Sequence, residues 1–135
     1  MGNLTLRSKI NEFEASMQLA PSRIDAADLV TLHHFTDNGL YARELILPAG
    51  VIISGKVKKS EYISVISAGS MTEVTEAGRQ RIRAPYTMVC APDTKRLLWA
   101  HTKTVWVTIH KVTSTDLEAV EAEIIGGDEI MEVMT

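Results

Sequence analysis

Four residues on one short stretch have the types and spacing to bind an anion. In "SGKVKKSEYISVIS", residues 54–67, the polar side chains of Lys56, Lys58, Ser60 and Tyr62 stand two positions apart. Alternate residues of a β-strand point to the same side, so this spacing predicts one shared face. Ammonium groups supply positive charge and hydroxyls supply hydrogen bonds, a combination that suits phosphate or carboxylate. Protonated lysines have no lone pair to offer a metal ion.

The four histidines are a weaker basis for a metal site. His33 and His34 are adjacent, so on a strand they face opposite sides and cannot chelate one ion together. His101 and His110 stand at either end of the apolar run "TKTVWVTI". We expect structural histidines here, and we keep His101 as a candidate member of the anion-binding set.

The region that must position these residues runs from 29 to 112 and has a β-type pattern. Short runs rich in β-branched and aromatic residues are separated by turn signals such as "TDNG", "PAG" and "EAGR". About nine strands with tight connections, and no helical stretch between them, predict an all-β antiparallel sandwich or barrel.

A helical pattern precedes this region. In "SKINEFEASMQLAP", the apolar residues Ile10, Phe13 and Met17 fall on one helical face. Ser8 is the expected N-cap and Pro21 the expected stop. We expect this stripe to pack on its own domain or on a sister subunit.

A second helical pattern follows the β-type region. In "TSTDLEAVEAEIIGG", Thr115 and Glu118 predict a capping box, and an apolar stripe continues until the glycine pair. The expected organisation is an N-terminal helix or arm at 1–28, a β-barrel at 29–112, and a C-terminal helix and tail at 113–135.

Composition excludes several classes of protein. The net charge is −3, with 14 basic and 17 acidic residues, so the overall charge gives no electrostatic attraction to nucleic acid or anionic lipid. The lone cysteine, Cys90, cannot form an intramolecular disulfide and is expected to be an inert strand residue. No apolar run reaches the ~18 residues of a membrane span. We therefore expect a soluble, cytoplasmic protein with no nucleic-acid or membrane partner.

Several phrases of the sequence resemble one group of proteins. "HHFTDNGLYARELILPAGVIISGKV", "TKRLLWAHTKTVWVTIH" and "TDLEAVEAEI" are similar to short cupin-like proteins encoded by tailed bacteriophages and prophages. The similarity covers roughly residues 32–125. It implies a cupin-like jelly-roll barrel with a short N-terminal helix and a C-terminal helix.

The same resemblance implies that the usual metal ligands are missing. Catalytic cupins bind a metal through two histidines one residue apart, a following glutamate, and another histidine after a Pro-x-Gly turn. By this resemblance Lys58, Ser60 and Tyr62 stand at the first positions, Asp93 replaces the turn glycine, and Arg96 falls near the last histidine. It therefore implies no metal and no cofactor, and it adds Arg96, from another strand, to the candidate ligand residues.

Two states of the barrel interior stay open. It is either an anionic small-molecule pocket or a lumen filled by side chains, with lysines reaching solvent. Three functions follow, and the residues favour one without catalysis. They are an accessory protein of phage type that binds an anion such as a nucleotide-like host signal, a structural or assembly protein of a virion, and a metal-dependent isomerase or dioxygenase. The first places the protein in the host cytoplasm, the second in the virion. A homo-oligomer, a dimer or a multiple of dimers, is expected.

Overall fold

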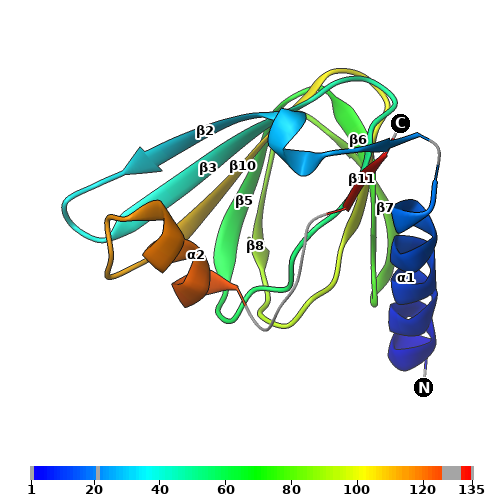
Figure 1. Cartoon of the computed structure of the whole chain (residues 1–135), viewed down its shortest axis with the longest axis horizontal. Coiled ribbons are helices and arrows are strands. Elements are labelled where there is room, and N and C mark those ends of the chain that lie inside the picture. The colour runs from blue at the N-terminus through cyan, green and yellow to red at the C-terminus, as the bar shows by residue number, and fades with distance from the viewer. Residues whose placement is uncertain (1, 21, 126–131, 135) are drawn as a thin grey trace.

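The fold is a sandwich of two antiparallel β-sheets with a helix toward each end of the chain (Figure 1). The computed structural model describes residues 2–20, 22–125 and 132–134. Within these residues, no helix has the length and apolar character needed to cross a membrane. The prediction of an all-β, cupin-like jelly-roll barrel with a short N-terminal helix and a C-terminal helix is confirmed.

One sheet has five strands, in the order β2-β3-β10-β5-β8. Along β3 and β10, buried side chains alternate with less buried ones, because successive residues of a pleated strand point to opposite faces. The strands are β2 (Val30–Phe35), β3 (Leu40–Leu47), β10 (Thr104–Lys111), β5 (Tyr62–Ala68) and β8 (Tyr86–Cys90).

The other sheet has six strands, in the order β1-β11-β4-β9-β6-β7. Two of them, β1 and β11, come from the segments that flank 29–112, where the sequence pattern did not indicate strands. The strands are β1 (Arg23–Ile24), β11 (Glu132–Met134), β4 (Ile52–Ser54), β9 (Leu97–Ala100), β6 (Ser70–Thr75) and β7 (Gly78–Arg83).

The two sheets enclose an apolar core toward one end of the sandwich. Leu45, Ile66 and Trp106 point inward from the five-stranded sheet and pack with Ile53 and Leu98 from the other. Each fully buried side chain of this kind contributes about 1.5–3 kcal/mol to the free energy of unfolding. This cluster is the main source of stability, which leaves the opposite end of the interior to other side chains.

Helix α1 (Gly2–Gln18) precedes the barrel and buries Ile10 and Met17, as its predicted apolar face requires. Its start is earlier than predicted, since the helix already includes Ser8. The interpretation of Ser8 as the N-cap was therefore wrong.

Ion pairs attach α1 to the barrel. Arg7 Nη1 lies 2.6 Å from Glu76 Oε1, and Glu14 Oε2 lies 2.6 Å from Lys95 Nζ. The hydroxyl of Ser54 also donates to Glu14. Helical stability in proteins comes mostly from tertiary packing, and these contacts explain why the helix extends beyond its expected cap.

A short 3-10 turn (Ala26–Asp28) precedes β2. Helix α2 (Leu117–Ile124) follows β10. The N-cap of α2 is Asp116, whose carboxylate accepts from the N–H of Ala119 at 3.1 Å, so the predicted cap at Thr115 was wrong by one residue. The predicted apolar stripe is buried in a small second cluster of Tyr41, Val112, Val120 and Ile124.

Candidate anion-binding site

The inward side chains of three neighbouring strands change from apolar to polar along the barrel. The cause lies in the sequence of each strand, because every second residue faces the interior. The pairing of β3, β10 and β5 places these side chains in three levels: first Leu45, Trp106 and Ile66, then Arg43, Thr108 and Ser64, and finally Tyr41, His110 and Tyr62.

The stretch 54–67 does not form the single strand that its alternation predicts. Strand β4 ends at Ser54 and β5 begins at Tyr62, and residues 55–61 form a crossover loop between them. The two strands belong to different sheets, so the chain must cross the sandwich here. The alternation therefore breaks, and Ser60 is exposed in the loop instead of facing the interior.

Lys58 enters the barrel from the crossover loop and is only 4% exposed. Its carbonyl accepts from the N–H of Asp93 at 2.9 Å, and its Nζ donates to the carbonyl of Lys56 at 2.8 Å. Nζ also lies 5.9 Å from the ring centroid of Tyr62. Burial, reinforced by the positive charge of Arg43, lowers the pKa of Lys58 from 10.5 to about 7. The amine therefore gains or loses its proton near neutral pH.

Arg43 projects inward from β3 and is 7% exposed. Its guanidinium carbon lies 5.9 Å from the ring centroid of Trp106, a cation–π distance. Burial lowers the pKa of Arg43, but a guanidinium remains charged in proteins. Among the described residues, no carboxylate forms an ion pair with Arg43 or with Lys58. Two buried cationic groups thus stand close together with no carboxylate in ion-pair contact among the described residues. The carboxylate of Glu121, which lines the same cavity as Arg43, only partly offsets the lowering of the pKa of Arg43.

Arg96 lies immediately before β9 and reaches the same end of the interior, but its charge is compensated. Its Nη1 is 2.5 Å from Glu73 Oε2, and its Nε donates to the hydroxyl of Tyr62 at 3.2 Å. Burial raises the pKa of Tyr62 to about 12, so its hydroxyl stays neutral. Arg96 therefore holds Tyr62 in place, and the carboxylate of Glu73 balances the positive charge of Arg96.

His110 is a neutral member of the site. Burial, followed by the charges of Lys58 and Arg43, lowers its pKa from 6.5 to about 3. Its Nε2 lies 3.0 Å from the hydroxyl oxygen of Thr108, and its ring stacks at 4.9 Å from that of Tyr62. His110 therefore offers hydrogen bonding without adding a third uncompensated charge.

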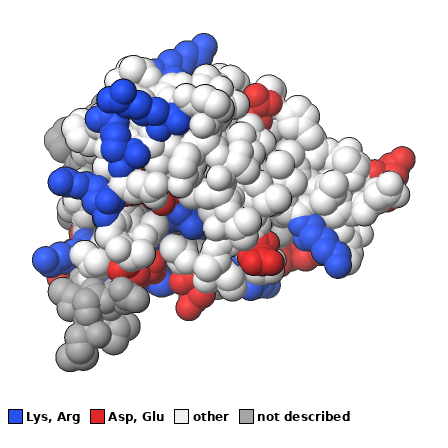
Figure 2. Space-filling view, turned by 180° about the vertical axis from the view of Figure 1, so that it is seen from behind, with Lys and Arg blue, Asp and Glu red and all other residues white. Residues whose placement is uncertain are grey.

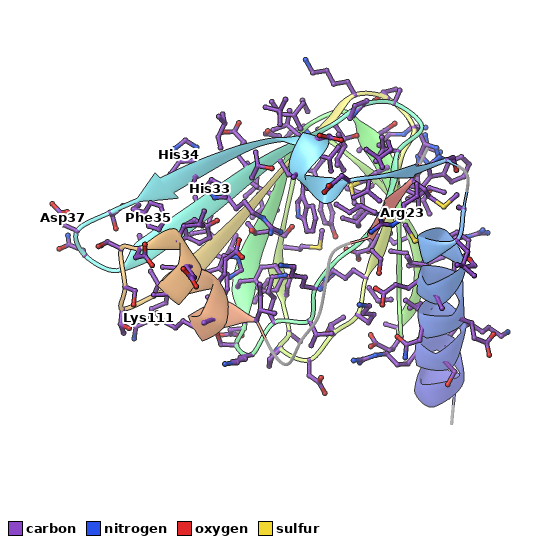
Figure 3. All side chains as sticks on the ribbon, in the orientation of Figure 1. Arg23, His33, His34, Phe35, Asp37 and Lys111 are labelled. Carbon is purple, nitrogen blue, oxygen red and sulfur yellow. The ribbon has the colours of Figure 1, made fainter. Side chains whose placement is uncertain are left out.

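A cavity of about 360 Å³ leads from the surface to Arg43. Lys56 Nζ and Glu121 Oε2, 4.0 Å apart, stand at its mouth. His33 lines it from β2, with Nδ1 2.7 Å from the hydroxyl of Tyr41, while His34 lies on the opposite side of the strand (Figure 3). The cavity is lined by Ala27, Leu29, Thr31, His33, Arg43, Lys56 and Glu121.

The structure brings together three of the six residues that the sequence nominated as ligands. Lys58, Tyr62 and Arg96 meet inside the barrel, from the crossover loop, β5 and the start of β9. Lys56 lines the cavity that reaches Arg43, whereas Lys58, Tyr62 and Arg96 are not among its lining residues. The three residues that meet inside the barrel combine ammonium, guanidinium and hydroxyl groups, and their role as ligands stays a prediction.

His101 lies elsewhere, on the outer face of the six-stranded sheet. Its Nε2 is 2.6 Å from the hydroxyl oxygen of Thr72, and its ring centroid is 4.3 Å from that of Trp99. Both neighbours point away from the barrel interior, since the residues on either side of them in β6 and β9 are buried. The structure therefore separates His101 from the other candidates.

Sequence reasoning missed Arg43, the most informative residue of the site. In "LYARELIL", Arg43 shares one strand face with Tyr41 and Leu45, but the other face carries Leu40, Ala42 and Ile46. Both faces contain apolar residues, so the alternation alone does not show that Arg43 points inward. His110 was noticed but assigned a structural role, because its neighbours in space were not known.

The residues at this end of the barrel do not fit the transition metal that catalytic cupins hold. The described residues contain no cluster of three or more His, Cys, Asp or Glu side chains placed to bind a metal ion. The groups that face one another are Arg43, Lys58 and Arg96, which repel a metal cation and lack a free lone pair when protonated. We derive no chemistry through a metal.

Comparison with known proteins shows the fold alone. No protein-family model and no curated protein matches the sequence. Among solved structures, KdgF from Halomonas sp. is similar at 13% identity and a TM-score of 0.57, over 70% of this chain and 91% of that one. Ectoine synthase from P. lautus matches at 13% identity and 0.58, over 80% and 79%. A cupin protein from Bacteroides fragilis matches at 18% identity and 0.51, over 69% and 85%.

Proposed function

We propose that this cupin-fold protein is a non-catalytic accessory protein that binds an anionic small molecule beside Arg43 and Lys58. The observation that carries the proposal is the pair of buried cationic groups, Arg43 and Lys58, that form no ion pair with a carboxylate among the described residues. Removing a charged group from water costs several kcal/mol unless a counter-charge and hydrogen bonds replace the solvent. A bound anion supplies both.

The other buried or half-buried cations near the interior support this assignment by contrast, because each forms an ion pair within 4.0 Å. Arg43 and Lys58 form none among the described residues, and Glu121 acts on Arg43 only at longer range. The compensated pairs are Arg96 with Glu73 at 2.5 Å, Lys95 with Glu14 at 2.6 Å, and Lys56 with Glu121 at 4.0 Å.

The groups around the two cations define the class of anion. Arg43 can form two parallel hydrogen bonds to a phosphate or carboxylate, and Lys58 adds a point charge. Two positive charges favour a doubly charged group. The cavity of about 360 Å³ is at the small end of the range for small-molecule sites. A phosphate-bearing molecule fits this chemistry, and in a phage setting a nucleotide-like host signal is the ligand we propose.

Calorimetric titration with inorganic sulfate tests the site, because sulfate keeps its double charge across the pH range of interest. We expect wild-type protein to bind sulfate, and Arg43→Gln and Lys58→Gln each to weaken binding by about tenfold or more. Lys59→Gln is the matched control, since Lys59 is the adjacent, exposed lysine of the same loop. Equal affinity in wild type and both site variants contradicts the proposal.

Native mass spectrometry of protein taken directly from the expressing cell identifies the natural ligand. We expect an added mass that is reduced in the Arg43→Gln variant and retained in Lys59→Gln. A bound mass that persists in Arg43→Gln places the ligand elsewhere and overturns the assignment.

A structural or assembly role in a phage virion is the second candidate. The observation in its favour is the number of exposed apolar side chains on the outside of the five-stranded sheet, including Leu32, Ile63 and Val89. Mass spectrometry of purified virions discriminates the two. Stoichiometric presence of the chain in virions, together with unchanged virion yield after Arg43→Gln, favours assembly over anion binding.

A metal-dependent isomerase or dioxygenase is the third candidate, and the cationic residues of the site argue against it. Elemental analysis of the purified protein is the direct test. A stoichiometric transition metal that is lost on substitution of His110 overturns our view of the site.

A further inference from the structure

The outer face of the five-stranded sheet is largely apolar. Only a histidine, a glutamate, a lysine and small hydroxyl residues interrupt it. The apolar side chains that point outward come from all five strands: Val30 and Leu32, Leu40, Ala42 and Ile46, Val105, Val107 and Ile109, Ile63 and Val65, and Val89. We call this set the outer apolar face.

Such a face is unusual for an antiparallel sheet. One side of such a sheet commonly faces water and carries polar residues, giving the alternation of apolar inward and polar outward positions. Here the outward positions are exposed or half-buried, and the exposed apolar side chains include Ile63 and Val89, which are 41% and 70% accessible. Helix α1 packs against β11 and β6 of the other sheet, and α2 packs against Tyr41 from the inner side.

The view from behind shows the same feature. The half of the molecule that carries the five-stranded sheet is largely uncharged, and the basic residues gather over the opposite half (Figure 2). Large contiguous apolar patches on a protein surface mark interaction sites. The outer apolar face is therefore a candidate interaction surface.

We propose that the outer apolar face packs against the same face of a second copy of this chain, as a two-fold symmetric pair of sheets. Its size suits this partner. Five strands about 4.8 Å apart, each with about six residues at ~3.4 Å, span roughly 24 by 20 Å. That projected area, about 480 Å², is more than half of the ~800 Å² that each partner buries in a standard interface.

Charge also favours a second copy. A two-fold axis places the same surface of both copies face to face, so a face with a net charge repels its own copy. The outward positions of this sheet carry one carboxylate, Glu44, whose Oε1 lies 3.2 Å from His34 Nε2, and one ammonium group, Lys111, so their formal charges balance. The charged residue Lys111 lies at the end of β10, on the rim.

The side chains themselves suit a sheet-to-sheet contact. Val and Ile have few rotamers, so they lose little conformational entropy when they are covered. Two sheets that pack face to face lie about 10 Å apart with interdigitated side chains. The cavity that leads to Arg43 opens on the inner side of the same sheet, so pairing leaves the anion site accessible.

Sedimentation velocity across a hundredfold range of concentration, up to about 100 μM, tests the proposal. We expect wild type to be a dimer. Ile63→Lys and Val89→Lys each place two ammonium groups in the interface of one dimer and are expected to raise the dissociation constant at least about 100-fold. Phe13→Lys on α1 is the matched control, since Phe13 is 39% exposed on another surface, and it should leave the dimer intact.

Val89→Lys keeps the test interpretable, because so exposed a position tolerates lysine in a folded monomer. Its circular dichroism and its sulfate affinity should match those of wild type. A monomeric wild type, a Val89→Lys variant that still dimerises, or a dimer lost only in Phe13→Lys each overturns the proposal. A monomer that floats with phospholipid vesicles also overturns it and assigns the face to lipid.

Discussion

The two ends of the barrel interior are built from the same strands but differ in what their side chains contribute. At the apolar end, Leu45, Ile66 and Trp106 pack with residues of the opposite sheet and stabilise the fold. At the other end, Arg43 and Lys58 are buried without an ion-pair partner among the described residues, which costs free energy. The two ends therefore contribute oppositely to stability, and the proposed anion would offset the cost at the cationic end.

The largest expected effect is at the apolar end. Ile66→Ala should lower the free energy of unfolding by about 2–5 kcal/mol, because a fully buried side chain is replaced by a cavity. Urea denaturation followed by circular dichroism measures this. The folded fraction should still bind sulfate with wild-type affinity. A loss of affinity without a loss of stability would mean that the two ends are not separate.

The opposite result is expected at the cationic end. Lys58→Met keeps the length of the side chain but removes the buried amine, and should raise the free energy of unfolding by about 1–4 kcal/mol while abolishing sulfate binding. Lys59→Met, at the exposed neighbouring position, should change the free energy of unfolding by no more than about 0.5 kcal/mol. If Lys58→Met destabilises the protein, the amine has a structural partner and the comparison fails.

His110 should make this end sensitive to acid. Its folded-state pKa, about 3, lies below the ordinary value of 6.5, so the unfolded chain binds the proton more readily. Stability is then lost as the pH falls from 6.5 toward 3, by about 2 kcal/mol at pH 5 from this residue. Thermal melts of wild type and His110→Gln between pH 7 and 5 measure it. The variant should show a shallower decline, and parallel curves would contradict the assignment.

The smallest expected effect is on the pH dependence of sulfate binding. Lys58 binds an anion only when protonated, and its pKa is about 7. Affinity should therefore fall by up to about tenfold per pH unit above pH 7, because the neutral amine must take up a proton for each anion bound. Lys58→Arg, which stays charged, should remove this dependence in calorimetric titrations from pH 6 to 9. A slope that survives in Lys58→Arg would assign the titration to another group.

Much of the fold could be predicted because its signals are local. The alternation in "LYARELIL", the turn residues between strands and the apolar stripe of Ile10 and Met17 each act over a few residues. The errors were local as well. The N-cap of α2 is Asp116, one residue from the expected Thr115, and β1 and β11 are too short for a sequence pattern to reveal.

The site was predicted only in part, for a different reason. Lys58 and Tyr62 were nominated from a strand face that does not exist, because the chain crosses between sheets at 55–61. They still meet, since the crossover loop returns Lys58 to the interior beside β5. Ser60 was nominated by the same alternation of strand residues, but it is exposed in the loop.

By itself, the sequence determined that this chain forms a β-barrel flanked by helices, and it predicted an anion-binding stretch. Both follow from residue type and spacing along single segments. Only the tertiary structure decided that Arg43 stands beside Lys58, that Glu73 neutralises Arg96, and that His101 lies on the outer surface. The balance of charge inside the barrel depends on strand pairing between distant segments, and no local pattern encodes which charges will meet.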